Sequence, residues 1–85
     1  MKETRIIGLL INDRVKESGL VQEILSKYAS IIKSRLGFHE VSEDVCSRSG
    51  VIILQLTGDV WQWEVFENEL SSIAGIEIQK MSFIL

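Results

Sequence analysis

The chain has 85 residues, a formal net charge of -3 at pH 7 and a single cysteine. Residues 1–85 therefore form one domain. The acidic balance gives no basic footprint for nucleic acid or for an anionic membrane, and one cysteine excludes both an intrachain disulfide and a zinc framework of paired cysteines. Hydrophobic residues make up 46% of so short a chain, so more apolar surface is present than a monomer would readily bury.

No segment of the sequence predicts a membrane anchor or a leader. The start "MKETR" is charged, and the apolar run "IIGLLI" after it is too short for a signal peptide or a transmembrane helix. We therefore expect a cytoplasmic protein with no membrane partner.

The first half of the chain predicts a strand and a long helix. The strand covers residues 4–12, which are mostly aliphatic and lead into the turn residues Asn12 and Asp13. The helix is expected to begin between residues 15 and 19, with Asp13 or Ser18 as its N-cap. Its apolar residues recur three and four positions apart and end before Gly37, which is expected to supply the left-handed helix stop. These apolar positions are Leu20, Val21, Ile24, Leu25, Tyr28, Ile31, Ile32 and Leu36.

The second half predicts three strands and one helix. Residues 38–46 alternate weakly and are polar, as is typical of an edge strand. Residues 51–57, "VIILQLT", give the clearest strand pattern of the chain. Asp59 and Gln62 form a capping-box pattern at the start of a helix over residues 60–74, which Gly75 ends. A last strand is expected over residues 76–85.

The order strand, helix, strand, strand, helix, strand predicts an α+β fold. Two split βαβ units of this kind form the ferredoxin-like βαββαβ sandwich, a four-stranded antiparallel sheet with two helices on one face. The first and third strands are then central, and right-handed crossovers place both helices on the same side.

The face of the sheet without helices is expected to be apolar as well. In the first strand Ile6 and Leu10 point away from Ile7, Leu9 and Ile11, and in the third strand Val51 and Ile53 point away from their neighbours. The last strand switches phase to Met81 and Phe83, which indicates either a bulge or apolar side chains aimed at the open face. Large exposed apolar surfaces mark interaction sites, so we expect a homo-oligomer joined through this open sheet face.

Two apolar residues on the second helix stand apart from its buried stripe. Trp61 and Val65 lie one turn apart, opposite the stripe that contains Trp63 and Phe66. They are either scattered surface hydrophobes or a contact patch, since tryptophan is enriched in interfaces.

The sequence offers little for metal binding or catalysis. His39 and Cys46 are the only soft metal ligands, and a tight transition-metal site needs three or four ligands. Such a site would have to be assembled across a subunit interface, with His39 and Cys46 as its weak candidates. A spacing of seven also puts the two on opposite faces of a regular strand, which disfavours a nucleophile and base pair. We expect no enzyme activity, no cofactor and no direct binding of nucleic acid.

Arg35 falls in line with the apolar side of the predicted first helix. Either its stem lies along that surface while the guanidinium reaches past the helix end, or it is held at a subunit interface, where it binds a carboxylate or an anionic effector.

Several segments together resemble a known family. The stretches "RIIGLLINDR", "YASIIKSRLGFHE", "GVIILQLTGD" and "LSSIAGIEIQKM" are similar to the small iron-only hydrogenase system regulators over nearly the whole chain, and Arg35-Leu36-Gly37 is the most distinctive part. Ser34 stands where a glycine is usual in that family, and Phe38-His39 replaces an aliphatic-proline pair.

The resemblance implies an ACT-like domain, similar to the C-terminal domain of nickel-responsive repressors. Such domains assemble as dimers or tetramers and bind small-molecule effectors at interfaces. Members are grouped with transcriptional regulators, although this chain has no room for a DNA-binding domain of its own. The helix end and the loop after it are then the candidate effector or interface contacts, together with the patch on the second helix: Arg35, Gly37, Phe38, His39, Trp61 and Val65.

Overall fold

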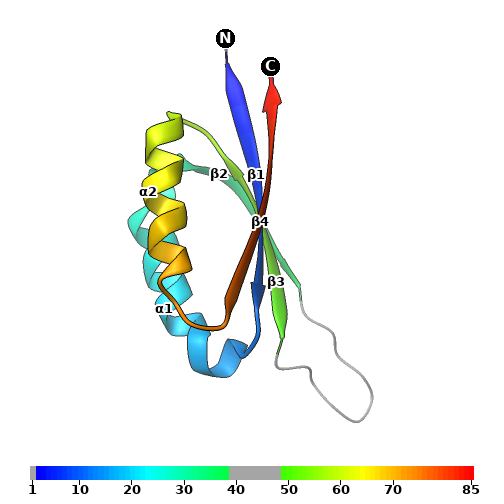
Figure 1. The fold of residues 1–85 in the computed structure, drawn as a ribbon, viewed down its shortest axis with the longest axis vertical. Helices are drawn as coiled ribbons and strands as arrows, with labels where there is room; N and C mark the ends of the chain where they lie inside the picture. The colour runs from blue at the N-terminus through cyan, green and yellow to red at the C-terminus, as the bar shows by residue number, and fades with distance from the viewer. Residues whose placement is uncertain (1, 39–48) are drawn as a thin grey trace.

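The computed structural model describes residues 2–38 and 49–85. Two helices cover one face of a four-stranded antiparallel sheet with strand order β2-β3-β1-β4 (Figure 1). This arrangement confirms the predicted α+β, ferredoxin-like fold with the first and third strands in the centre. The elements in chain order are β1 (Glu3–Ile11), α1 (Arg14–Lys27), a short 3₁₀ helix η1 (Ala29–Ile31), β2 (Ile32–Phe38), β3 (Gly50–Leu56), α2 (Val60–Ser71) and β4 (Ile76–Ile84).

The hydrophobic core lies between the sheet and the two helices. Every second residue of β1 and β3 points into it, and α2 supplies its two largest side chains, Trp63 and Phe66, both with no exposed surface. Aromatic residues dominate core energetics because each buries a large apolar area. The core residues are Ile7, Leu9, Ile11, Val21, Leu25, Ile31, Ile52, Leu54, Leu56, Trp63, Phe66, Leu70 and Ile73.

The start of α2 is as the sequence predicts, but the helix ends at Ser71, three residues before the predicted end at residue 74. Asp59 is the N-cap, and its backbone N–H donates to Gln62 Oε1 at 3.0 Å within a capping box. Gly58, just before the cap, has a positive φ of 98° and Gly75 has a φ of 81°. Both values lie in the left-handed region that favours glycine, so these two residues fix where the chain enters and leaves the turns that flank α2.

The predicted end of the first helix is wrong. The helix begins at Arg14, directly after the candidate cap Asp13, but it ends at Lys27 instead of Leu36. Residues 32–38 form the edge strand β2, and no described residue other than Gly58 and Gly75 has a positive φ. Gly37 therefore sits in a strand opposite Ile52 and does not stop a helix. The predicted edge strand at 38–46 falls mostly outside the described residues.

Length and pairing explain why the helix stops early. A helix running from Arg14 to Leu36 would be about 35 Å long, whereas a nine-residue strand spans only about 30 Å. The chain instead turns at η1, where the Ile31 carbonyl accepts a hydrogen bond from Thr57 N–H at 2.8 Å. Ile32 then pairs with Leu56 at the end of β3. Because β3 would otherwise lack a neighbour on that side, tertiary pairing overrides the helical periodicity of this segment.

Candidate functional site

The face of the sheet that carries no helix, here called the open face, is largely apolar. The strand registers place apolar residues from all four strands on it, and Glu77 is the only charged residue there among those with a register partner in the described strands. Met81 and Phe83 are about half exposed, and β4 pairs with β1 without a register shift. The change of phase in β4 therefore comes from apolar side chains on the open face and not from a bulge. The described apolar residues of this face are Ile6, Leu10, Leu36, Val51, Ile53, Met81 and Phe83.

One corner of the open face is polar and held by side-chain hydrogen bonds. Thr4 Oγ1 donates to the Leu56 carbonyl at 3.0 Å and accepts from Gln55 Nε2 at 3.3 Å. Ser34 Oγ donates to Gln55 Oε1 at 3.4 Å. This chain of bonds ties β2, β3 and β1 together at the edge of a neighbouring hollow.

The hollow lies where β3 leaves the sheet and β1 continues beyond it. Its volume is about 530 Å³, and its wall runs from the ends of β1 and β4 to the turn before α2. Lys2 and Lys33 line it, and neither ammonium group has an ion-pair partner in the described part of the chain. The two carboxylates in the wall are already engaged, since Asp59 caps α2 and Glu3 lies 3.9 Å from Arg5. The two lysine ammonium groups are therefore the charged groups of the wall that have no ion-pair partner among the described residues.

The main chain of β1 also faces this hollow. Leu85 N–H donates to the Lys2 carbonyl at 2.8 Å, so Lys2 directs its backbone groups toward β4. Backbone groups alternate in direction along a strand, and Glu3 therefore directs its N–H and C=O to the opposite side. β3 pairs with β1 only up to Arg5, which leaves these two groups beyond the end of the β1–β3 ladder, in the wall of the hollow.

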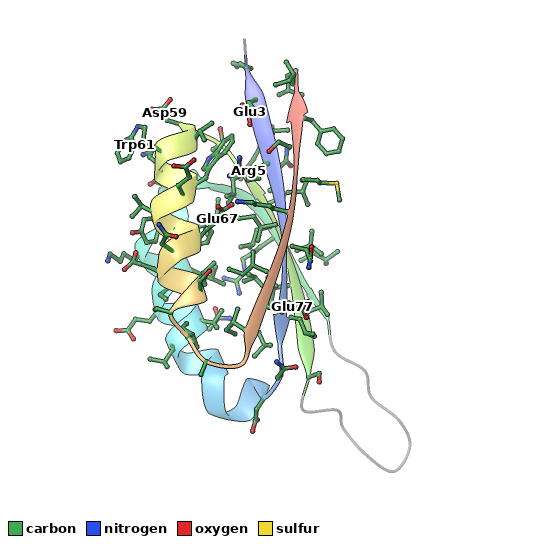
Figure 2. The ribbon with its side chains drawn as sticks, in the orientation of Figure 1. Glu3, Arg5, Asp59, Trp61, Glu67 and Glu77 are labelled. Carbon is green, nitrogen blue, oxygen red and sulfur yellow. The ribbon has the colours of Figure 1, made fainter. Side chains whose placement is uncertain are left out.

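A buried charge network joins α2 to the sheet. Glu67 is only 7% exposed; its Oε1 accepts from Arg5 Nη1 and its Oε2 from Lys80 Nζ, both at 3.1 Å. The Arg5 guanidinium also lies 5.1 Å from the Trp63 ring and donates from Nε to Ser82 Oγ at 3.0 Å. Figure 2 shows Glu67 and Arg5 facing each other between α2 and β1. Both charges are paired, as buried charges need to be.

This network was not predicted from the sequence, although two signals were present. Glu67 lies four residues after Trp63 and three before Leu70, which puts a carboxylate on the apolar stripe of α2. Arg5 has the same parity in β1 as Ile7 and Leu9, which puts a guanidinium on the core side. A cation and an anion that both point into one core predict a buried ion pair.

A second ion pair links the two helices. Lys27 Nζ donates to Glu69 Oε1 at 2.8 Å. This hydrogen bond raises the pKa of Lys27 and lowers the pKa of Glu69. Hydrogen bonding to the same carboxylate raises the pKa of Tyr28. All three shifts move away from neutral pH, so these groups keep their ordinary charges near pH 7, and the ion pair joins α1 to α2 at the surface.

The structure separates the residues that the sequence grouped as one site. Arg35 lies on the helix side of edge strand β2, where its Nη2 donates to Gln22 of α1 at 3.0 Å. Neither Arg35 nor Gly37 contributes to the hollow. Phe38 is the last residue of β2 and pairs with Val51. His39 and Cys46, the weak metal candidates, lie outside the described residues.

Trp61 and Val65 lie on the outer side of α2, as the helical spacing predicts. They are 64% and 45% exposed, and Figure 2 shows Trp61 pointing away from the sheet. Neither residue contributes to the hollow or to the open face.

Two kinds of feature are absent from the described residues. Within residues 2–38 and 49–85, no three His, Cys, Asp or Glu side chains are grouped so that they could hold a metal ion. No helix in the same ranges is long and apolar enough to cross a membrane.

Comparisons with known proteins place the chain in a fold class, the small ferredoxin-like α+β domains. No protein-family model and no curated protein matches it. Among solved structures it is similar to the uncharacterized protein TM1266 from Thermotoga maritima, with a TM-score of 0.82 and 24% identity over 99% of this chain and 100% of that one.

Two other solved structures share the fold at lower similarity. The de novo designed protein Foldit4 has a TM-score of 0.58 and 14% identity over 100% of this chain and 99% of that one. A formyltetrahydrofolate deformylase from Pseudomonas putida KT2440 has a TM-score of 0.55 and 8% identity over 92% of this chain, but only 28% of the deformylase is covered. At these identities the likenesses establish the fold alone.

Proposed function

We propose that this chain is a non-catalytic regulatory domain that self-associates through its open face and senses a small anionic effector. The observation that carries the proposal is the open face itself, a sheet surface that presents apolar residues from all four strands and one charged residue, Glu77, among its register-paired positions. Exposed apolar surfaces of this extent mark interaction sites. Membership among the iron-only hydrogenase system regulators is part of the proposal and rests on the sequence resemblance.

A second copy of the chain is the partner that this face fits. In a twofold dimer the same patch meets itself, so the apolar residues of the face can pack against apolar residues of the other copy. Four strands 4.8 Å apart and about seven residues long give a flat area of about 450 Å² per copy, or about 900 Å² for two. That is just below the 1,200–2,000 Å² typical of stable interfaces, so a face-to-face dimer is feasible but small.

The self-association is tested by placing a charge on the open face. Leu36 is 59% exposed on β2, so Leu36→Glu leaves a single copy intact and puts a carboxylate into the proposed interface. We expect the mass measured by light scattering at about 50 μM to fall at least twofold, because a buried unpaired charge costs several kcal/mol.

Val65→Glu is the matched control, since it puts the same charge at an exposed apolar position on α2. We expect it to keep the wild-type mass. A wild-type protein that is monomeric at this concentration contradicts the proposal, and so does a Leu36→Glu variant that keeps the wild-type mass.

The effector part of the proposal rests on the hollow between β1 and α2. Lys2 and Lys33 offer two cations with no ion-pair partner in residues 2–38 and 49–85, and the Glu3 backbone and the exposed Thr57 add polar groups to its wall. Anions bound by lysine are held mainly by point-charge attraction. A small molecule with a carboxylate or phosphate group is therefore the expected ligand class.

Thermal unfolding with citrate, inorganic phosphate and AMP tests this site. At constant ionic strength we expect at least one of these anions to raise the midpoint by 2–4 °C, because a ligand that binds only the folded state stabilises it. Lys33→Gln should abolish the rise. Lys27→Gln removes a lysine that lies elsewhere and pairs with Glu69, so it should retain the rise even if its own midpoint is lower. An equal rise in all three proteins would show nonspecific stabilisation and remove the hollow as the site.

A further inference from the structure

The edge strand β4 has the features of a strand that pairs with another chain. It pairs with β1 over nine consecutive residues without a register shift, whereas the other edge strand, β2, is interrupted at Lys33. Its last residues are apolar and exposed: Met81 at 58%, Phe83 at 50% and Ile84 at 60%. A long, regular, apolar edge is a template for further strand pairing.

The usual protection of edge strands is limited to the first part of β4, up to Lys80. Edges are blunted by bulges, prolines or charges, and β4 has neither a proline nor a bulge. Its two charged residues are Glu77 and Lys80, and the Lys80 ammonium is drawn toward the core side by Glu67 at 3.1 Å. The half of β4 beyond Lys80 carries no charge at all.

The free backbone groups of β4 can be assigned to alternate residues. Leu85 N–H donates to Lys2, and the Gly75 carbonyl accepts from Asn12 N–H at 3.0 Å. Residues 75 and 85 therefore direct their backbone groups toward β1, and by alternation the even-numbered residues direct theirs outward. The outward-facing residues are Ile76, Ile78, Lys80, Ser82 and Ile84.

We infer that β4 pairs with β4 of a second copy across a twofold axis close to Ser82, so that two sheets join into one of eight strands. A register centred on Lys80 would put two ammonium groups directly opposite each other, which destabilises a strand pair. A register centred on Ser82 instead sets Met81 of each copy opposite the partner's Phe83. It also sets Lys80 opposite the partner's Ile84, with all charges apart.

This pairing would enlarge the contact between open faces, which is small when only two copies meet. This step of the argument rests on the proposed self-association through the open face. A twofold axis perpendicular to the sheet keeps both open faces on the same side, so the joined face doubles to about 900 Å² per pair. Two such pairs stacked face to face bury about 1,800 Å² in all, within the range of stable interfaces. The expected assembly is a tetramer with two different twofold contacts.

The β1–β4 ribbon gives a separate reason for the edge to be covered. β1 and β4 extend past the end of β3 and past α2, with both chain termini at the same end of the molecule (Figure 1). An isolated two-stranded ribbon is marginally stable in water. Addition of the partner's β4 makes it part of a wider sheet and covers Ile84.

A proline at Ser82 tests the edge pairing. The Ser82 N–H faces outward, so Ser82→Pro removes a donor needed by the partner and leaves the β1–β4 bonds in place. Ser82→Ala is the matched control, because it also removes the hydroxyl that Arg5 contacts but keeps the N–H. By light scattering we expect four chains in wild type and Ser82→Ala, and two chains in Ser82→Pro with an unchanged circular dichroism spectrum.

Cross-linking gives a second readout that does not depend on the proline. In a Cys46→Ser background, Ser82→Cys should form a covalent dimer with a short bismaleimide in more than half of the chains. Glu64→Cys, on the exposed side of α2, should give less than a tenth of that yield. Absence of the Ser82→Cys product, or a Ser82→Pro variant with the wild-type mass, overturns the edge pairing.

The two contacts fail in distinguishable ways. If Leu36→Glu dissociates the protein and neither Ser82→Pro nor the cross-linker has an effect, the open-face contact stands and the edge contact is wrong. If Ser82→Cys cross-links but Leu36→Glu keeps the wild-type mass, the edge contact stands and the proposed open-face association is wrong.

Discussion

Glu67→Ala should lower the free energy of unfolding by about 3–5 kcal/mol, because it leaves the Arg5 guanidinium buried without its counter-ion. The Arg5 side chain is only 12% exposed, and the contacts that remain are Ser82, the Trp63 ring and a 3.9 Å approach to Glu3. None of them replaces a direct carboxylate bond. Urea denaturation at one fixed protein concentration measures the change, since association also contributes to apparent stability.

Two variants separate the buried network from a general effect of changing α2. Glu64→Ala removes an exposed carboxylate from the same helix and should change the unfolding free energy by less than about 0.5 kcal/mol. Glu67→Gln keeps an oxygen that can accept from Arg5 and should fall between the two. Equal losses for Glu64→Ala and Glu67→Ala would show that the network contributes nothing beyond ordinary helix composition.

The network also explains why β4 keeps a lysine where apolar residues would otherwise continue. Ile76 and Ile78 pack against the core, and Lys80 is the next residue on the same side of the strand. Its ammonium group meets Glu67, which compensates the charge and draws it away from the strand edge. One carboxylate on α2 therefore links the stability of a single copy to the accessibility of the β4 edge.

Most of the fold followed from local patterns that agree with one another. The strand at 51–57 has apolar residues pointing to both sides of the sheet, as predicted. One set packs into the core, and the other lies on the open face. Asp59 and Gln62 correctly predicted the start of α2, whereas Gly75, predicted to stop the helix, lies in the turn after it, because α2 already ends at Ser71. In the strand and at the start of α2 the sequence pattern and the tertiary structure require the same conformation.

The segment from Tyr28 to Gly37 was assigned wrongly because its pattern fits two structures. Ile31, Ile32 and Leu36 continue the helical spacing, but Leu36 and Phe38, with Gly37 between them, also fit the two-residue period of a strand. The choice between helix and strand is made by pairing with β3, which has no other neighbour on that side of the sheet. This pairing depends on the whole sheet and not on the local sequence. Periodicity alone cannot distinguish helix from strand in so short an apolar segment.

The candidate site was the least predictable part for a related reason. The Arg35-Leu36-Gly37 triplet was interpreted as a helix end, and in the strand its members face opposite sides of the sheet. Arg35 contacts α1, while Leu36 joins the open face. The hollow is formed by chain ends and turns that are distant in sequence, so no local sequence pattern predicts it.

Trp63→Ala should be as damaging as any single change in the core, with a loss of about 3–5 kcal/mol in the free energy of unfolding. Trp63 has no exposed surface, packs against Arg5 and lines the hollow. Its Nε1–H donates to the Thr57 carbonyl at 2.8 Å, which holds the turn between β3 and α2. The ring therefore supports the core and the wall of the hollow together.

Trp63→Phe separates these two roles. It keeps an aromatic ring in the core but removes the bond to Thr57, so we expect a smaller loss of about 1–2 kcal/mol. Because the turn that carries Gly58 and Asp59 is then held less firmly, the midpoint rise produced by the anions should also shrink. Trp61→Ala, at the exposed tryptophan two residues earlier, should change neither quantity when measured at one protein concentration. A Trp63→Phe variant that loses stability but keeps the full anion response would show that the turn does not shape the site.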